Sequence, residues 1–154
     1  MISPEILRRY PFFSGLDDAA LKAIAMISEE VFFANGDTIY ETGEPNSSIY
    51  ILEEGCIESY LVVEDPNNST YHKEYYLDDL DLGEVFWISA LVEPKIHTTT
   101  ARGSRDGRFV RISGAGIESL CELNPHLGYI LMRAMADQLL YRLQQDRIQL
   151  AACR

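Results

Sequence analysis

A chain of 154 residues that is 47% hydrophobic is long enough to bury the core of one domain and too apolar to be a disordered tail. Its net charge of −11 disfavours binding to nucleic acid by the chain alone, because contacts to phosphate supply most of that affinity. No apolar run approaches the length of a membrane span, and the N-terminus has no basic segment followed by an apolar one. The sequence therefore predicts a cytoplasmic protein that does not associate with a membrane.

The first part of the chain, residues 1–28, is predicted to be helical. Asp17 is placed to cap a helix whose apolar side includes Leu21 and Ile24. Leu16, just before the cap, and Leu21, four residues inside the helix, are spaced to pack together as a hydrophobic staple.

Residues 29–113 contain short apolar runs that alternate with glycine-containing turns. Glycine permits the positive φ angles that tight turns require, and the runs are rich in β-branched and aromatic residues. This pattern predicts an antiparallel double-stranded β-roll, a jelly roll of the cupin type, which encloses a pocket. The expected turns lie at Asn35-Gly36, Gly43-Glu44-Pro45, Glu54-Gly55 and Leu82-Gly83-Glu84, and the clearest runs at 29–33, 38–40, 49–52, 56–63 and 108–113.

Residues 114–154 are predicted to form two helices that complete a single domain over residues 1–154. Gly114 opens a short helix, and Asn124-Pro125 ends it. The same pair can begin the final helix, with asparagine as the cap and proline in the first turn. We expect this helix to run from about Pro125 to Ala151.

The final helix carries apolar side chains in two stripes. The first contains Met132, Ala136, Leu139, Leu143 and Leu150, and the second contains Ile130, Ala134, Tyr141 and Ile148. Two stripes predict two packing partners, one being the roll of the same chain and the other a second subunit. A homodimer through the first stripe is the favoured hypothesis, and packing of both stripes within one monomer is the alternative.

The order of elements and several motifs resemble the cyclic nucleotide-binding domain of the catabolite activator protein family. The opening segment 10–16, Tyr-Pro-Phe-Phe-Ser-Gly-Leu, is similar to the start of that domain. Gly36-Asp37-Thr38-Ile39, Gly43-Glu44 and the segment 50–55 resemble its glycine framework. The resemblance covers nearly the whole chain and implies a helix, an eight-stranded roll, a short helix and a long helix.

In this family a short helix after a Gly-Asp turn binds the cyclic phosphate through backbone N–H groups. The resemblance further implies a glutamate that bonds the ribose hydroxyl and an arginine that pairs with the phosphate. The corresponding segment here begins at Gly83-Glu84, and Phe86 matches the family phenylalanine. Trp87 then stands in place of glycine, Ile88 in place of the glutamate and His97 in place of the arginine.

These replacements predict altered or lost affinity for cyclic AMP. Trp87 should fill part of the space that a nucleotide occupies, and Ile88 cannot accept a hydrogen bond from a hydroxyl. His97 lacks the forked donors of arginine and is largely uncharged at neutral pH. An alternative alignment places Gly83-Glu84 on the family Gly-Glu pair, which leaves Lys95 as the nearby cation. The candidate ligand-binding positions are Phe86, Trp87, Ile88, Ser89, Ala90, His97, Thr98 and Thr99.

Other side chains indicate neither catalysis nor metal binding. The three cysteines, Cys56, Cys121 and Cys153, are far apart and odd in number, which favours reduced thiols over disulfides or a metal site. Asp78, Asp79 and Asp81 lack the pattern of a calcium loop and are expected to form a solvated acidic turn. No nucleophile-base pair or paired catalytic carboxylates are evident, so the sequence does not predict an enzyme.

The sequence thus favours a regulatory module that binds a small ligand, such as a cyclic nucleotide or another small anion, and that signals through its C-terminal helix. Two alternatives remain open. One is a dimeric interaction scaffold whose pocket is closed by Trp87. The other is a transcription regulator of the same family without its helix-turn-helix, because the chain ends at Arg154.

Overall fold

The computed structural model describes residues 1–86 and 88–154, and the prediction for Trp87 lies outside the described residues. The chain begins with the helical segments α1 (Pro4–Arg8), η1 (Pro11–Phe13) and α2 (Asp18–Met26). The predicted cap is confirmed, since the Asp17 carboxylate accepts a hydrogen bond of 2.8 Å from the N–H of Ala20.

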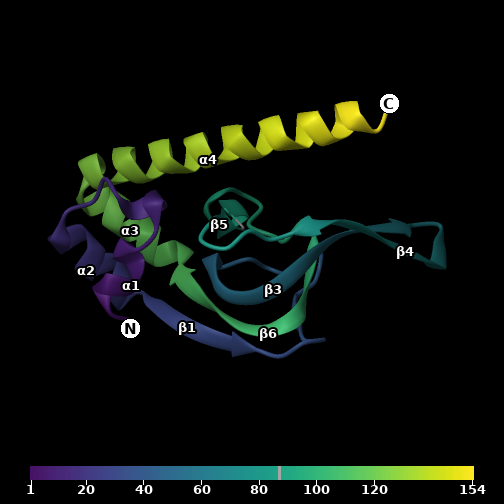
Figure 1. Cartoon of the computed structure of the whole chain (residues 1–154), viewed down its shortest axis with the longest axis horizontal. Helices are drawn as coiled ribbons and strands as arrows, with labels where there is room; N and C mark the ends of the chain where they lie inside the picture. Colours follow the sequence, from purple (N-terminus) through teal and green to yellow (C-terminus); the bar gives the residue numbers. More distant parts are fainter. Residues whose placement is uncertain (87) are drawn as a thin grey trace.

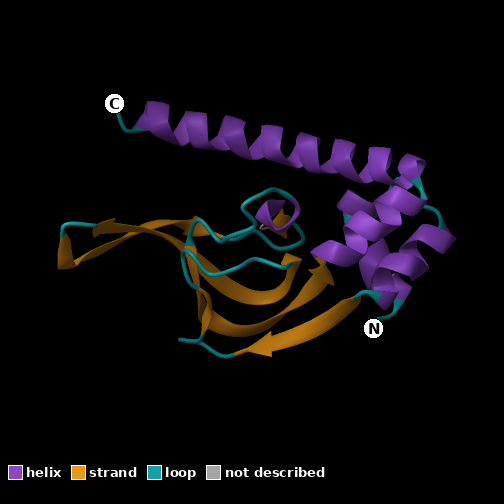
Figure 2. Ribbon diagram, turned by 180° about the vertical axis from the view of Figure 1, so that it is seen from behind, coloured by secondary structure: helices purple, strands orange, loops and turns teal. Residues whose placement is uncertain are grey.

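The middle of the chain forms an antiparallel roll, as predicted, in which strands curl around an apolar interior (Figures 1 and 2). The order across the sheet is β1-β6-β3-β4, with β2 paired to β6 and β5 paired to β3. The strands of the described residues are β1 (Ser28–Phe33), β2 (Thr38–Tyr40), β3 (Ser48–Asp65), β4 (Asn68–Asp79), β5 (Val85–Phe86) and β6 (Thr100–Ser113).

The predicted turn at Glu54-Gly55 is wrong, and so is the expectation of eight separate strands. The described residues contain six strands, because β3 continues through Gly55 as a bend instead of ending there. Gly55 has a φ of +92°, and the pairing of β3 with β6 shifts register on both sides of it. On β6, a Cβ atom at Gly107 would lie 2.0 Å from the Glu54 carbonyl oxygen. Glycine is required there because the two backbones approach so closely.

The C-terminal part contains η2 (Ile88–Leu91), α3 (Gly114–Leu123) and α4 (Pro125–Ala152). Asn124 caps α4 as predicted, since its side-chain oxygen accepts a hydrogen bond of 3.2 Å from the N–H of Leu127. Helix α4 has 28 residues, which corresponds to a length of about 42 Å. It runs along the open side of the roll, and its C-terminal end projects past β5 toward the far end of β4 (Figures 1 and 2).

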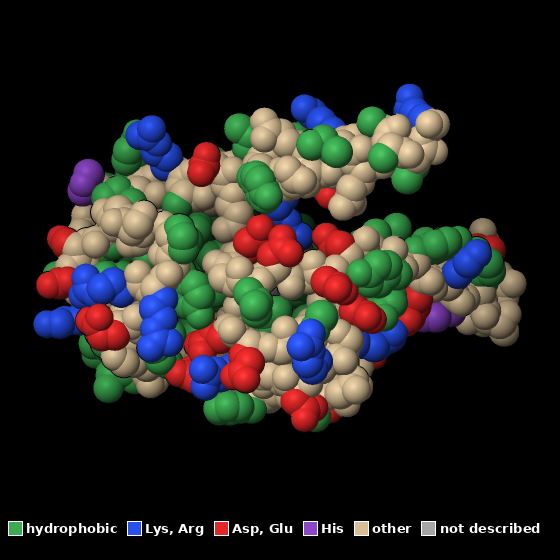
Figure 3. All heavy atoms as spheres, in the orientation of Figure 1, with side chains coloured by type: hydrophobic (Ala, Val, Ile, Leu, Met, Phe, Trp, Pro, Cys, Tyr) green, Lys and Arg blue, Asp and Glu red, His purple; other side chains and the backbone are tan. Residues whose placement is uncertain are grey.

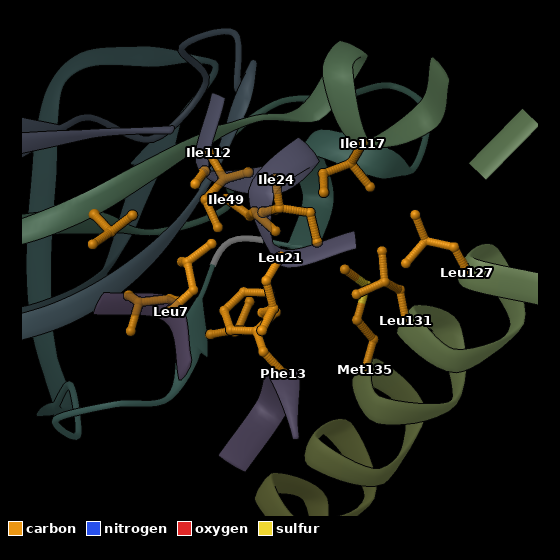
Figure 4. Close-up of a cluster of buried hydrophobic side chains, with 14 of the residues drawn as sticks. Leu7, Phe13, Leu21, Ile24, Ile49, Ile112, Ile117, Leu127, Leu131 and Met135 are labelled. Carbon is orange, nitrogen blue, oxygen red and sulfur yellow. The ribbon is translucent and has the colours of Figure 1, made fainter. Parts of the chain in front are cut away.

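The main hydrophobic core joins the helices to one end of the roll. Figure 4 shows Leu7, Phe13, Leu21 and Ile24 of the N-terminal helices against Ile49 and Ile112 of β3 and β6. From α4 this core takes Leu127, Leu131 and Met135.

The stripe of α4 that packs on its own chain is therefore neither of the two predicted stripes. It contains Leu127, Leu131 and Met135, which are at most 5% exposed. Met132, Leu139 and Leu143 of the first predicted stripe are between 45% and 52% exposed. The prediction failed because apolar side chains surround this helix on several sides, so periodicity alone does not identify the side that faces the core.

Candidate functional site

A cavity of about 590 Å³ lies between the roll and α4. This volume is in the usual range for a site that holds a small molecule. In the space-filling view the surface is hollowed below the projecting part of α4, with acidic side chains at the edge of the hollow (Figure 3). The lining residues come from β3, β4, β5, η2, the segment 97–99 and α4: Ser59, Leu77, Asp78, Leu80, Val85, Phe86, Ile88, Ser89, His97, Thr98, Thr99, Leu139, Arg142, Leu143, Asp146 and Gln149.

Six of the eight predicted ligand positions lie in this lining: Phe86, Ile88, Ser89, His97, Thr98 and Thr99. They converge because β5 pairs with the first half of β3, which carries η2 to the mouth of the roll. The side chain of Ser89 is fixed by Asn46, whose amide nitrogen donates a hydrogen bond of 2.9 Å to its hydroxyl. The assignment of these residues as ligand contacts stays a prediction.

The backbone before η2 passes from a tight turn through a short strand into the short helix. Gly83 has a φ of +80° and forms the turn, β5 follows at Val85–Phe86, and the short helix begins at Ile88. The choice between the two alignments of this segment stays a prediction.

His97 forms a rigid, neutral part of the cavity wall. It is 4% exposed, and its ring stacks on Tyr40 with 3.7 Å between ring centroids and 17° between planes. Burial lowers the pKa of His97 below its usual value, and Glu44 opposes this shift more weakly. At neutral pH the imidazole therefore contributes no positive charge to the cavity wall.

Two other predicted residues lie outside the cavity lining. Ala90 is 2% exposed and belongs to the main core, close to Gly114. Lys95, the cation of the alternative alignment, pairs with Glu118 on α3 at 3.0 Å and more distantly with Glu93 at 3.8 Å. The assignment of Ala90 as a ligand position stays a prediction.

Helix α4 forms one side of the cavity and is tied to β5 by the side chain of Gln138. The Gln138 oxygen accepts a hydrogen bond of 3.2 Å from the Val85 N–H, and its nitrogen donates one to the Val85 carbonyl. One turn further along, the guanidinium of Arg142 lies over the ring of Phe86 at 4.5 Å from its centroid. Both contacts join α4 to the strand that leads directly into η2.

The sequence interpretation missed the charged residues of the cavity. Asp78 lies at the end of β4, while Arg142 and Asp146 are one turn apart on α4. Asp78 was expected in a solvated acidic turn, but it is half-buried and faces the cavity, whereas Asp79 and Asp81 are exposed. The available signal was the spacing of Leu139, Arg142, Leu143 and Asp146, which places them on adjoining parts of one helix face.

Comparison with known proteins identifies the family. The model of the cyclic nucleotide-binding domain family matches residues 30–124, and the chain belongs to this family. A proposed cyclic nucleotide-binding protein from Geobacter metallireducens GS-15 has a similar solved structure, with a TM-score of 0.77 and 36% sequence identity. The match covers 93% of this chain and 99% of that protein.

More distant relatives share the fold. The structure of the Thermus thermophilus catabolite activator protein matches with a TM-score of 0.70 at 17% identity, covering 93% of this chain and 62% of that one. A CRP-like cAMP-activated global transcriptional regulator of Mycobacterium tuberculosis is 24% identical over 135 residues. That match covers 88% of this chain but only 58% of the regulator, so the chain spans little more than half of this curated relative.

The described residues contain neither a metal-binding cluster nor a membrane-spanning helix. Outside position 87, no group of His, Cys, Asp or Glu side chains is arranged to hold a metal ion. In the same residues, none of the helices combines the length and apolar character that crossing a membrane requires.

Proposed function

We propose that this chain is a regulatory, non-catalytic domain that binds a small molecule in the cavity below α4, has little or no affinity for cyclic AMP, and acts in the cytoplasm. The observation that carries this proposal is the cavity itself, whose walls combine the family's ligand-binding segment with the C-terminal helix. An open cavity supports ligand binding over a scaffold with a closed pocket.

We expect reduced affinity for cyclic AMP because this chain lacks the glutamate and the arginine of the family motif. The relative from M. tuberculosis is described as cAMP-activated. In the favoured alignment, the apolar Ile88 and the neutral, buried His97 stand where the family motif has the glutamate for the ribose and the arginine for the phosphate. Loss of a charge-assisted, bidentate contact to phosphate removes about 1.5–3 kcal/mol of binding free energy.

Helix α4 is the output element in this proposal. Gln138 and Arg142 connect it to Val85 and Phe86, immediately before the ligand-binding segment. A ligand that displaces this segment would change those contacts and so shift the position of α4. A structural change in the cavity therefore has a direct route to the surface of the molecule.

Calorimetric titration with cyclic AMP tests the proposed affinity. We expect no binding in the micromolar range by the wild-type protein. The triple variant Trp87→Gly, Ile88→Glu and His97→Arg rebuilds the family motif and should gain measurable affinity. Lys95→Arg is a matched control, because it places a guanidinium near the site but outside the cavity lining. Micromolar or tighter binding by the wild-type protein would overturn the proposal.

We further propose that the first predicted stripe of α4 forms a homodimer. Met132, Leu139 and Leu143 are exposed in the single chain. Leu139 and Leu143 follow the last α4 residue that fills the core, Met135, whereas Met132 lies on the exposed side of the core-packing half. The C-terminal end of α4 projects past the roll (Figure 1). A row of exposed apolar side chains along a helix is typical of a surface that another molecule covers. Met132 and Ala136 lie in this stripe but outside the cavity lining, so they separate dimerisation from ligand binding.

The double variant Met132→Glu and Ala136→Glu should therefore be monomeric and should retain the fold. Light scattering measures its mass, and circular dichroism checks that the roll is intact. The control variant Gln144→Glu and Gln145→Glu adds the same two charges to the same helix and should remain dimeric. If the wild-type protein is a monomer at high micromolar concentration, the dimer proposal is wrong.

A further inference from the structure

The charged side chains around the cavity are mostly acidic, whereas a site for phosphate is mostly basic. Its described lining contains two carboxylates, Asp78 from β4 and Asp146 from α4, and one basic side chain, Arg142. Asp79, Asp81 and Glu84 lie beside the cavity, around the same arginine. Figure 3 shows acidic side chains at the hollow below α4.

Arg142 does not make the net charge of the described lining positive. Its guanidinium lies over the Phe86 ring, and it has an attractive electrostatic interaction with both Asp78 and Glu84. Burial nevertheless raises the pKa of Asp78, and repulsion from Asp146, Asp81 and Asp79 adds to this increase. Two carboxylates thus face one guanidinium in the described lining, and a second positive charge placed between the carboxylates would be attracted to both.

The other lining residues are apolar or carry uncharged hydroxyl groups, which suits an organic molecule. Its apolar walls include Leu77, Leu80, Phe86 and Leu139. The hydroxyl groups of Ser59, Ser89, Thr98 and Thr99 add hydrogen-bonding capacity without charge. A ligand with an apolar body and one polar group at its end would match these walls.

We propose that the cavity selects a small molecule that carries a protonated amine on an aromatic or aliphatic body, and that it excludes molecules that carry phosphate or carboxylate. The amine would lie between Asp78 and Asp146, and the apolar body would lie against Phe86 and Leu139. This inference rests on the proposed ligand-binding function and adds to it the chemical class of the ligand. An anion entering the same space would meet a net negative lining in a partly desolvated site, where charges interact more strongly than in water.

Sets of compounds that share an aromatic body and differ in the charge of the end group test the inference. Tryptamine, tryptophol and indole-3-propionate share an indole body and carry a positive, a neutral and a negative end group, respectively. Phenethylamine and 3-phenylpropionate form a second pair. Saturation-transfer NMR detects binding of each compound, calorimetry gives its affinity, and cyclic AMP is measured beside them. We expect the amines to bind at least about tenfold more tightly than their neutral and anionic counterparts.

Variants of the carboxylates identify the site. Asp78→Asn and Asp146→Asn should each weaken amine binding by about tenfold and should reduce the preference over the neutral compound. Asp78→Glu should retain much of the preference because it keeps the charge. Asp137→Asn removes the same charge from α4 outside the cavity lining and should leave amine affinity unchanged. Thermal unfolding of each variant confirms that it is folded.

The outcomes separate the inference from the proposed function. If tryptophol or indole-3-propionate binds as tightly as tryptamine, or if Asp78→Asn does not weaken amine binding, the charge inference is wrong while the cavity remains a ligand site. If neither amine binds, the charge inference is wrong. If cyclic AMP binds the wild-type protein at micromolar concentration or below, the proposed function is contradicted.

Discussion

The two halves of α4 have different surroundings although they form one continuous helix. The first half contributes Leu127, Leu131 and Met135 to the main core. The second half lies over the cavity, and its apolar side chains Leu139, Leu143, Ile148 and Leu150 are 45–62% exposed. Gln138, hydrogen-bonded to Val85, lies at the boundary between the two halves.

This difference shows how one helix can both stabilise the fold and take part in binding. Residues that fill the core are constrained by close packing, so their position changes little. The second half is held to the roll by a few contacts at its beginning, and the remaining turns extend over the cavity. A ligand or a second subunit that binds the second half of α4 can therefore move it without destabilising the core.

The largest expected effect is the destabilisation caused by shortening a side chain of the first half. Leu131 is fully buried, so Leu131→Ala should lower the free energy of unfolding by about 2–5 kcal/mol. Leu143 is 45% exposed, so Leu143→Ala, the same change in the second half, should cost about 0.5 kcal/mol or less. Urea unfolding measures both values. Equal losses for the two variants would show that the halves do not differ as described.

Substitution of Asp78 should change the free energy of unfolding by a smaller amount and should increase it. Because the pKa of Asp78 is raised in the folded state, folding disfavours the ionised form, and this group destabilises the protein as pH rises above about 4. Asp78→Asn should therefore be slightly more stable than the wild type at pH 7 and should lose this advantage near pH 3. Urea unfolding at both pH values checks the sign. Lower stability of the variant at pH 7 would indicate that Asp78 is favourably paired instead.

Much of the fold could be predicted from the sequence because its signals are local. The caps formed by Asp17 and Asn124 each depend on a few neighbouring residues, and both were confirmed. The error at Gly55 arose because a glycine with positive φ serves a turn and a bend within a strand equally well. Only the pairing of β3 with β6, which joins residues more than 40 positions apart, distinguishes the two.

Less of the cavity was predictable. The segment from Phe86 to Ser89 and the segment from His97 to Thr99 could be located because they resemble a family motif. Asp78, Arg142 and Asp146 come from elements that meet only in the folded molecule, and their local sequence is typical of an exposed surface. The packing side of α4 was missed for a similar reason, since tertiary contacts select one of several apolar sides.

The central claim is that Gln138 connects the ligand-binding segment to the second half of α4, and hydrogen exchange tests it most directly. The variant Gln138→Ala loses both hydrogen bonds to Val85, a change of about 1–3 kcal/mol in local stability. Gln144→Ala, an exposed position one to two turns further along, is the control.

We predict that Gln138→Ala speeds amide exchange in residues 139–152 and in β5, while residues 127–135 exchange as slowly as in the wild type. The control should match the wild type throughout. Unchanged exchange in residues 139–152, or an equal increase along the whole of α4, would contradict the account.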